Sequence, residues 1–388
     1  MRRRSQIALV LALCAAVVAV RPGISGPDPV VAARDRLLGH GWNDPGQVRL
    51  RWFGVTNFIA SFGGHVVLLD AWVIQGTIAD YVPITVGDLI AADPEYIYIG
   101  HGHFDHAAHA GAIAEATGAK IIGTAEHCAG AKEDATNPDA VACVPILDAA
   151  GNEFHGGNSQ PPSPPYVPPT PFGTLGHPTE GPPGLGVTAA LGKHSSPRPP
   201  DPTSLRAPVG VPNGPPAILQ YPPSPTDFAH LFDNSGDDEG GSVVYRFQWG
   251  QFSLAWHDTV GPLSNPGEGG TEEIRRALAA LGSVDLELGA VQGFNQITNG
   301  LKDVRVYVES LRPKVFMPAH HDNWLPPNAT TGSAYYEPLV AELDLIPFAT
   351  RPGLCFISDP DNYRAPFVFK TSEWNGPYSG TIGGCWTP

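Results

Sequence analysis

Short apolar runs separated by a helical pattern mark the first region that can be interpreted. Residues 95–99 are rich in strand-forming residues, and a second apolar run covers residues 120–124. Between them, residues 105–117 are rich in alanine, which favours a helix, and Gly118 stands where a helix commonly ends. Strand, helix and strand in this order predict a βαβ unit.

The second half of the chain repeats this alternation. Apolar runs at residues 242–249 and 251–256 flank Gly250 and predict a hairpin. The elements expected after it are a helix at 271–281 with Thr271 as its N-cap, a strand at 286–291, a helix at 303–311 and a strand that ends at His320. Both halves therefore predict an α/β fold.

Residues 152–226 depart from this pattern because they are dense in proline. Proline has no amide proton and fixes φ, so long regular elements are disfavoured there. We expect an insertion within one domain of residues 27–388, which either runs over the surface or covers part of a cleft. Inside it, residues 187–193 have the pattern of a short strand, and His194 follows directly.

The densest group of reactive side chains follows the predicted strand at residues 95–99. Three histidines and one aspartate lie within six positions, as His101, His103, Asp105 and His106. Side chains two positions apart point the same way along an extended backbone, so the first two imidazoles share one side. Imidazole and carboxylate groups bind borderline cations such as zinc. One pair can therefore hold one metal ion, and the next pair can hold a second.

This His-x-His-x-Asp-His pattern after a strand resembles the signature of the metallo-β-lactamase superfamily. The resemblance covers about residues 51–322, and it is closest to the branch with the ascorbate-6-phosphate lactonase-like enzymes and the N-acyl-phosphatidylethanolamine-type phospholipase D. It implies an opening hairpin over residues 51–58 and 64–70. It also implies a four-layer αβ/βα sandwich with the long Pro-rich insertion, and a metal site at the seam between two sheets.

The resemblance implies further ligands from late in the chain. Asp258 takes the place of the metal-bridging carboxylate, and His320 takes the place of the final ligand. His321 is one position later and would point to the opposite side of an extended strand. One metal site would then consist of Asp105, His106 and His320, with Asp258 able to contact both ions.

The third partner of His101 and His103 stays open at this point. His194 stands in a His-x-Ser-x-Arg pattern, which resembles the form seen at this step in the branch named above. His230 is the alternative, because it lies closer to Asp258 along the chain and needs no long insertion between them.

Four other histidines are weaker candidates. His65 falls in the opening hairpin and His109 in the predicted helix, so both are interpreted as structural. His127 follows the end of a strand and could approach the cleft. His257 replaces the glycine that usually precedes Asp258 in the family, and a ring there would change the space beside the bridging carboxylate.

Residues 1–26 have the pattern of a secretory signal. Arginines at residues 2–4 precede an apolar stretch at residues 7–20, which is too short to span a bilayer comfortably. We therefore expect a protein that is secreted or held in the bacterial envelope or periplasm, without a stable membrane span. Lipid attachment at Cys14 is an alternative, although Leu13 precedes it where a small residue is wanted.

The charge of the chain argues against nucleic acid as a partner. The formal net charge is −15, and removal of residues 1–26 takes away four arginines and no acidic residue, which lowers it to −19. Such an acidic body repels a phosphate backbone, so the nucleases of the superfamily are excluded. A small-molecule substrate is expected instead, and the oligomeric state is left open.

Four cysteines follow the predicted signal segment, at Cys128, Cys143, Cys355 and Cys385. An even number in an exported chain favours two disulfides, for which three pairings exist. Pairing of neighbours along the chain closes the shortest loops and would pin a C-terminal tail at residues 355–388. Four buried free thiols are the alternative.

The resemblance and the ligand set predict an exported hydrolase that carries two zinc ions per chain, with Mn²⁺ or Fe²⁺ as other possible ions. A zinc-bound hydroxide, oriented by Asp105 as the catalytic residue, would attack an ester, lactone or phosphodiester. A β-lactamase and a non-catalytic binding protein that retains the fold are the alternatives.

Overall fold

The computed structural model describes residues 28–73, 84–156, 169–195, 240–264, 269–292, 300–321, 333–357, 365–376 and 382–385. The predicted signal segment, Cys14, His230 and much of the Pro-rich insertion lie outside these ranges. Of the described helices, none combines the length and the hydropathy that a bilayer crossing requires.

The first half of the chain forms most of a seven-stranded sheet with the order β13-β1-β2-β3-β4-β5-β6. Its strands are β1 (Gln47–Trp52), β2 (Phe58–Phe62), β3 (His65–Leu69), β4 (Tyr96–Tyr98), β5 (Lys120–Gly123), β6 (Cys143–Pro145) and β13 (Phe367–Lys370). Strands β3 to β6 run parallel, and the remaining pairs are antiparallel. β13 comes from the predicted C-terminal tail, so part of that tail is an edge strand of this sheet.

The second half forms a six-stranded sheet with the order β12-β11-β10-β9-β8-β7. Its strands are β7 (Leu185–Leu191), β8 (Val243–Trp249), β9 (Phe252–His257), β10 (Leu286–Ala290), β11 (Val315–Ala319) and β12 (Gly353–Leu354). β7 is the strand predicted inside the Pro-rich insertion, and it pairs antiparallel with β8.

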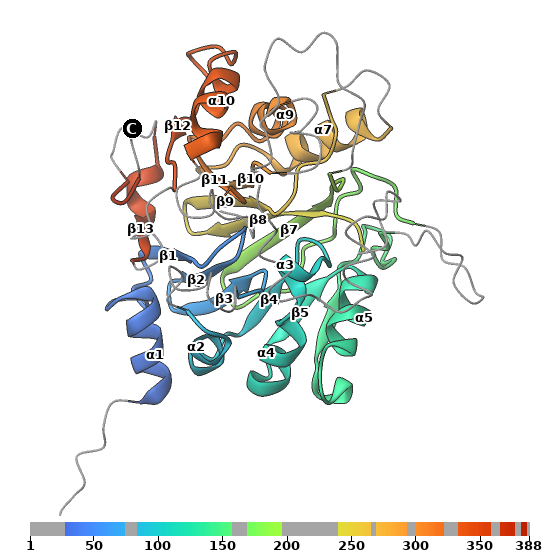
Figure 1. Ribbon diagram of the computed structural model, residues 1–388, viewed down its shortest axis with the longest axis vertical. Helices are drawn as coiled ribbons and strands as arrows, with labels where there is room; N and C mark the ends of the chain where they lie inside the picture. The colour runs from blue at the N-terminus through green and yellow to red at the C-terminus, as the bar shows by residue number, and fades with distance from the viewer. Residues whose placement is uncertain are drawn as a thin grey trace, which may run out of the picture.

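The two sheets face each other, and helices cover their outer faces (Figure 1). The outer layer of the first sheet contains α1 (Pro29–Leu38), α2 (Val86–Ala91), α4 (Ala110–Thr117) and α5 (Ala125–Glu133). The outer layer of the second sheet contains α7 (Thr271–Leu281), α9 (Lys302–Leu311) and α10 (Ser333–Leu343). The predicted four-layer αβ/βα sandwich is therefore confirmed.

The period of two along a strand explains how β9 serves both sides of its sheet. Phe252, Leu254 and Trp256 pack in the core that contains the space between the sheets, whereas Ala255 packs with the outer helices. Aromatic contacts join the two sheets directly, since the rings of Phe62 and Phe247 lie 5.6 Å apart. The side chains after Trp256 inherit this alternation, which matters for the site.

Two predicted elements differ from the structure near the candidate ligands. The helix expected at 105–117 is split into α3 (Phe104–Ala107) and α4, because the His109 amide donates to the Ala71 carbonyl (3.1 Å) instead of to Asp105. The Asp105 carbonyl accepts from the Asn57 amide group (3.1 Å). A neighbouring loop therefore takes over the hydrogen bonds that would continue the helix.

The opening hairpin is also wrong in its details. β1 ends at Trp52, and the chain turns before β2, with hydrogen bonds between Phe53 and Asn57 (3.0 Å) and from Asn57 to the Gly54 carbonyl (2.8 Å). The region is a three-stranded meander, because Gly54 and Val55 both adopt positive φ and reverse the chain.

The predicted N-cap of the helix at 271–281 is also wrong. The N-cap of α7 is Gly270, and Thr271 is the first helical residue.

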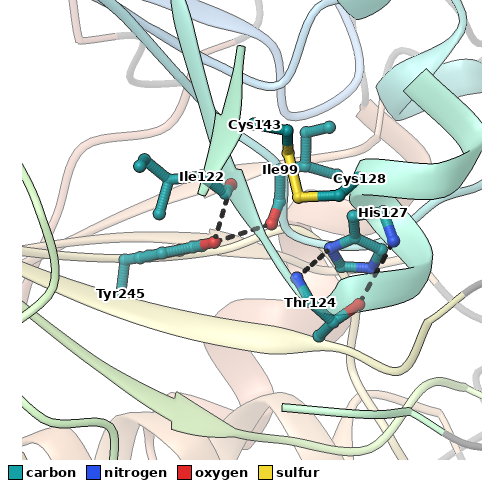
Figure 2. Close-up of a disulfide and its surroundings, with 7 residues drawn as sticks. All are labelled: Ile99, Ile122, Thr124, His127, Cys128, Cys143 and Tyr245. Carbon is teal, nitrogen blue, oxygen red and sulfur yellow. Dashed lines mark hydrogen bonds between the residues drawn. A yellow bond between two sulfur atoms is a disulfide. The ribbon is translucent and has the colours of Figure 1, made fainter. Parts of the chain in front are cut away.

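The four described cysteines form the two local disulfides. Cys128 on α5 is bonded to Cys143 on β6, 15 positions later (Figure 2). Cys355 is bonded to Cys385, 30 positions later, which ties the described end of the tail to the residues after β12. The favoured pairing is confirmed.

We expect one reactive thiol per full-length chain when it is unfolded without reductant, because the two disulfides use four of its five cysteines. Reduction should lower the free energy of unfolding by about 3 kcal/mol through the 15-residue loop alone, since an open loop regains chain entropy. Thiol counting in denaturant and urea unfolding with and without reductant measure both values. Five reactive thiols under oxidising conditions would contradict the pairing.

Candidate metal centre

Seven buried side chains meet where the two sheets come together, and they form three overlapping groups of possible metal ligands. The groups are His101, His103 and His194; His101, His106 and Asp258; and Asp105, His106 and His320. Within each group one ligand atom per residue lies within 4.8 Å of the others. All seven side chains that the sequence singled out are therefore brought together, and their role as metal ligands stays a prediction.

The loop after β4 supplies the first ligands because it can approach the second sheet closely. A Cβ atom at Gly100 would overlap the carboxylate of Asp258, so only glycine fits at this position. The Gly100 carbonyl also accepts from the amide of Val243 on β8 (2.8 Å). These contacts hold His101 and His103 against the ends of β8 and β9.

The first group contains three imidazole rings that face one another. Ring centroids lie 4.6 Å apart for His101 and His103, 4.6 Å for His101 and His194, and 4.5 Å for His103 and His194. His194 comes three positions after the last residue of β7, Leu191, and it is the histidine placed here, whereas His230 lies outside the described residues. Three imidazoles whose ligand nitrogens lie within 4.8 Å of one another fit a zinc-type cation.

Asp258 belongs to the middle group, which shares His101 with the first group and His106 with the last. Its Oδ2 atom is 2.8 Å from His101 Nδ1 and 3.5 Å from His106 Nδ1. Its Oδ1 atom is buried and has no hydrogen-bond partner among the described residues. Leaving a buried carboxylate oxygen without a partner costs free energy, and a cation bound there would supply one.

The remaining group combines the start of α3 with the end of β11. His106 Nε2 lies 3.3 Å from His320 Nε2, and Asp105 Oδ2 lies 3.5 Å and 3.6 Å from these two nitrogens. The amide of His320 donates to the Val55 carbonyl (2.8 Å), which fixes the end of β11 against the first sheet. His321 faces the other way and stacks on Phe356, at 4.7 Å.

Asp70 is a site residue that sequence reasoning missed. Its Oδ2 atom accepts from His106 Nδ1 (2.7 Å) and Thr56 Oγ1 (3.1 Å), and its Oδ1 atom accepts from the Gly100 amide (3.0 Å). Burial and then Asp258 raise the pKa of Asp70 well above its ordinary value. A carboxylate behind a ligand imidazole fixes its ring and tautomer. The only signal was an aspartate at the end of an apolar run.

Burial favours the neutral form of four histidines of the site. It lowers the pKa of His101 and His106 well below 6.5, and it lowers the pKa of His194 and of His320 to about 4. Neutral imidazole has the free lone pair that a metal ligand requires. The side chains are therefore ready to bind a cation at neutral pH.

Three other predicted histidines have contacts outside the ligand groups. His65 pairs with Glu95 (2.9 Å), and His109 Nδ1 accepts from the Val73 amide (3.1 Å), which agrees with their structural interpretation. His127 does not join a ligand group. It lies at the start of α5, where it contacts Thr124.

The sequence predicts that the ring of His257 changes the space beside the Asp258 carboxylate. This prediction is wrong, because the ring lies elsewhere. It points to the helical side of β9, where it lies 3.0 Å from Glu287 Oε1 and stacks on Tyr307 at 4.6 Å. A Cβ atom at Gly289 would overlap the ring, so glycine leaves room for it. The alternation along β9 separates this ring from the ligand groups.

Comparisons with known proteins find sequence similarity over part of the chain. No family model matches the chain. A UPF0173 metal-dependent hydrolase of Pyrobaculum aerophilum is 40% identical over 79 residues, which cover 20% of this chain and 33% of the relative. A second one, from Anaeromyxobacter dehalogenans, is 38% identical over 78 residues, 20% of this chain and 27% of the relative.

The chain is thus similar to metal-dependent hydrolases. The match spans 33% of the length of the first relative and 27% of that of the second. Solved structures with a related arrangement include Igni18, a metallo hydrolase of Ignicoccus hospitalis, at 16% identity and a TM-score of 0.48, covering 83% of this chain and 98% of that one. Another is the metallo-β-lactamase fold protein YhfI of Bacillus subtilis, at 10% identity and a TM-score of 0.42, with the same coverage.

We predict that the metal-free protein loses stability as the pH falls from about 6.5 to about 4. The unfolded chain binds protons on His194 and His320 near 6.5, whereas burial lowers the pKa of each in the folded state to about 4. Each of the two histidines should lower the free energy of unfolding by roughly 3 kcal/mol at the acid end of this pH range. Urea unfolding of chelator-treated protein across this range measures the loss.

The variant His194→Asn/His320→Asn serves as the comparison, because it lacks both groups. Its stability should fall less steeply with decreasing pH than that of the unmodified chain. Equal slopes for the two proteins would contradict the assignment of the loss to these histidines.

Proposed function

We propose that the protein is an exported metal-dependent hydrolase that holds two divalent cations, most naturally zinc, in the seven-residue site. The observation that carries the proposal is the position of the Asp258 carboxylate. It lies next to His101 of the first group and His106 of the last group, and one of its oxygens is buried without a partner among the described residues. Imidazole nitrogens and carboxylate oxygens suit zinc and also Mn²⁺ or Fe²⁺.

The two outer groups would each hold one cation. His101, His103 and His194 would bind the first, and Asp105, His106 and His320 would bind the second, with Asp258 between them. Bound cations would lower the pKa of water and polarise a carbonyl or phosphoryl oxygen of the substrate. Both effects serve hydrolysis of an ester, a lactone or a phosphodiester.

The side chains of the site would divide the remaining tasks. Asp105 would be a ligand, and its Oδ2 atom lies 3.5 Å from His106 Nε2 and 3.6 Å from His320 Nε2, so its carboxylate can accept a proton from the attacking water and keep it oriented. Asp70 would hold the His106 ring so that Nε2 points toward His320. The acidic charge of the chain supports a small-molecule substrate over nucleic acid.

Export rests on the arginines and the apolar stretch at the start of the chain. The two disulfides support it, since such bonds persist in oxidising compartments. Localisation of the full-length chain in a bacterial host, followed by sequencing of the mature N-terminus, tests this part of the proposal.

Elemental analysis should find about two metal ions per chain, and a panel of lactone, phosphodiester and β-lactam substrates should reveal one hydrolysed class. We expect His103→Ala to reduce that hydrolysis by on the order of 10³-fold or more, because it removes a ligand from the first group. Chelation should have the same effect, and added zinc should reverse it.

His65→Ala is the matched control, because it removes a histidine that pairs with Glu95 outside the site. It should retain full turnover and full metal content. Full turnover in His103→Ala, or a fully active chain without metal, would refute the proposal.

A further inference from the structure

Two backbone hydrogen bonds join the three segments around the first ligand group. The chain leaves β7 toward His194 and returns to β8 at residues 240–242, which we call the return segment. The Gly192 amide donates to the Ser242 carbonyl (2.6 Å), and the Val243 amide donates to the Gly100 carbonyl (2.8 Å). The place of His194 relative to the loop after β4 therefore depends on the return segment.

The imidazole of His127 lies against this return segment. His127 is 2% exposed, and its Nδ1 atom accepts from the Thr124 amide (3.2 Å) at the start of α5 (Figure 2). Its Nε2 atom donates to the carbonyl of Gly241 (3.2 Å). An amide donor on one side and a carbonyl acceptor on the other require the neutral ring with its proton on Nε2.

The packing around His127 is tight. A Cβ atom at Gly240 would overlap both the His127 ring and the Thr124 hydroxyl, and one at Gly156 would overlap the Gly240 backbone. Gly240 has φ of 84° and Gly241 has φ of 72°, so the return segment has a left-handed backbone shaped to the ring. A shift of the ring would therefore be passed on to the segment.

The ring itself is fixed to the first sheet. Thr124 and His127 form a capping box at the N-terminus of α5, and the next residue, Cys128, is bonded to Cys143 on β6 (Figure 2). The hydrogen bond from His127 to Gly241 thus connects a rigid part of the first sheet with the chain that returns to the second.

We propose that His127 is a positioning residue, which fixes His194 beside His101 and His103 by holding the return segment at Gly241. The inference rests on the proposed function, because it assigns a metal to this group. The group of Asp105, His106 and His320 is held by other contacts, namely Asp70 on His106 and Val55 on His320. His127 should therefore affect one metal site and spare the other.

Two substitutions separate the two hydrogen bonds of the ring. His127→Asn places an oxygen where Nδ1 lies, so it retains the cap of α5 but does not reach Gly241. His127→Gln places an amide nitrogen near the position of Nε2, so it can reach Gly241 but loses the acceptor for Thr124. His65→Asn is the control, because His65 contacts Glu95 outside the site.

The metal-free proteins are titrated with zinc against a chelating indicator, and with cobalt to distinguish the two sites by absorption. We expect His127→Asn to weaken one of the two binding events by about 10- to 100-fold and leave the other unchanged. His127→Gln should weaken it less, and His65→Asn should match the unmodified chain. Equal weakening of both events, or no weakening in His127→Asn, would overturn the proposal.

Amide hydrogen exchange of the metal-free proteins gives a test that needs no metal. His127→Asn should speed exchange at Gly192 and Val243, whereas His65→Asn should not. Unchanged exchange at both amides would overturn the positioning role. A third outcome is that the unmodified chain binds no metal while exchange at these amides is still faster in His127→Asn. This outcome would refute the proposed function but would support the role of the hydrogen bond from His127 to Gly241.

Discussion

The site depends on the close approach of Gly100, from the first sheet, to the Asp258 carboxylate from the second. No side chain fits at residue 100, and the carboxylate that occupies the space lies 2.8 Å from the next residue, His101. The contact therefore fixes the distance between the carboxyl ends of β4 and β9. Each of the three described ligand groups combines residues that follow β4 of the first sheet with a residue that follows a strand of the second sheet.

This arrangement has an energetic cost when no cation is bound. Seven titratable side chains are buried together with Asp70, and burial raises the pKa of that carboxyl and lowers the pKa of four of the histidines. Hydrogen bonds between the sheets, such as the one from the Tyr245 hydroxyl to the Ile99 carbonyl (2.9 Å), help to hold the surrounding layers together (Figure 2). Bound cations would compensate the buried carboxylates and give the Asp258 Oδ1 atom a partner. Metal binding and the stability of the fold should therefore be coupled.

Much of this could be predicted from the sequence because the signals are local. The spacing of His101 and His103 after a strand follows a period of two. His320 and His321 do point apart, but His320 follows the end of β11 with φ of 62°, so a turn of the backbone separates them and not strand alternation. The missed features depend on contacts between distant residues. The helix break at His109 comes from Ala71, Asp70 acts on a histidine 36 positions later, and His127 meets Gly241 114 positions away. No pattern within a single element carries that information.

The ligand group that contains His194 and the group that contains His320 are held in place by different contacts. His106 and His320 are fixed by Asp70 and Val55, which belong to the continuous first meander. His194 stands at the exit to residues 196–239, and its position depends on the return segment and on Ser195, whose amide donates to Thr259 Oγ1 (3.4 Å). A displacement of residues 192–195 or of the return segment can therefore reach His101, His103 and His194, while Asp105, His106 and His320 keep their geometry.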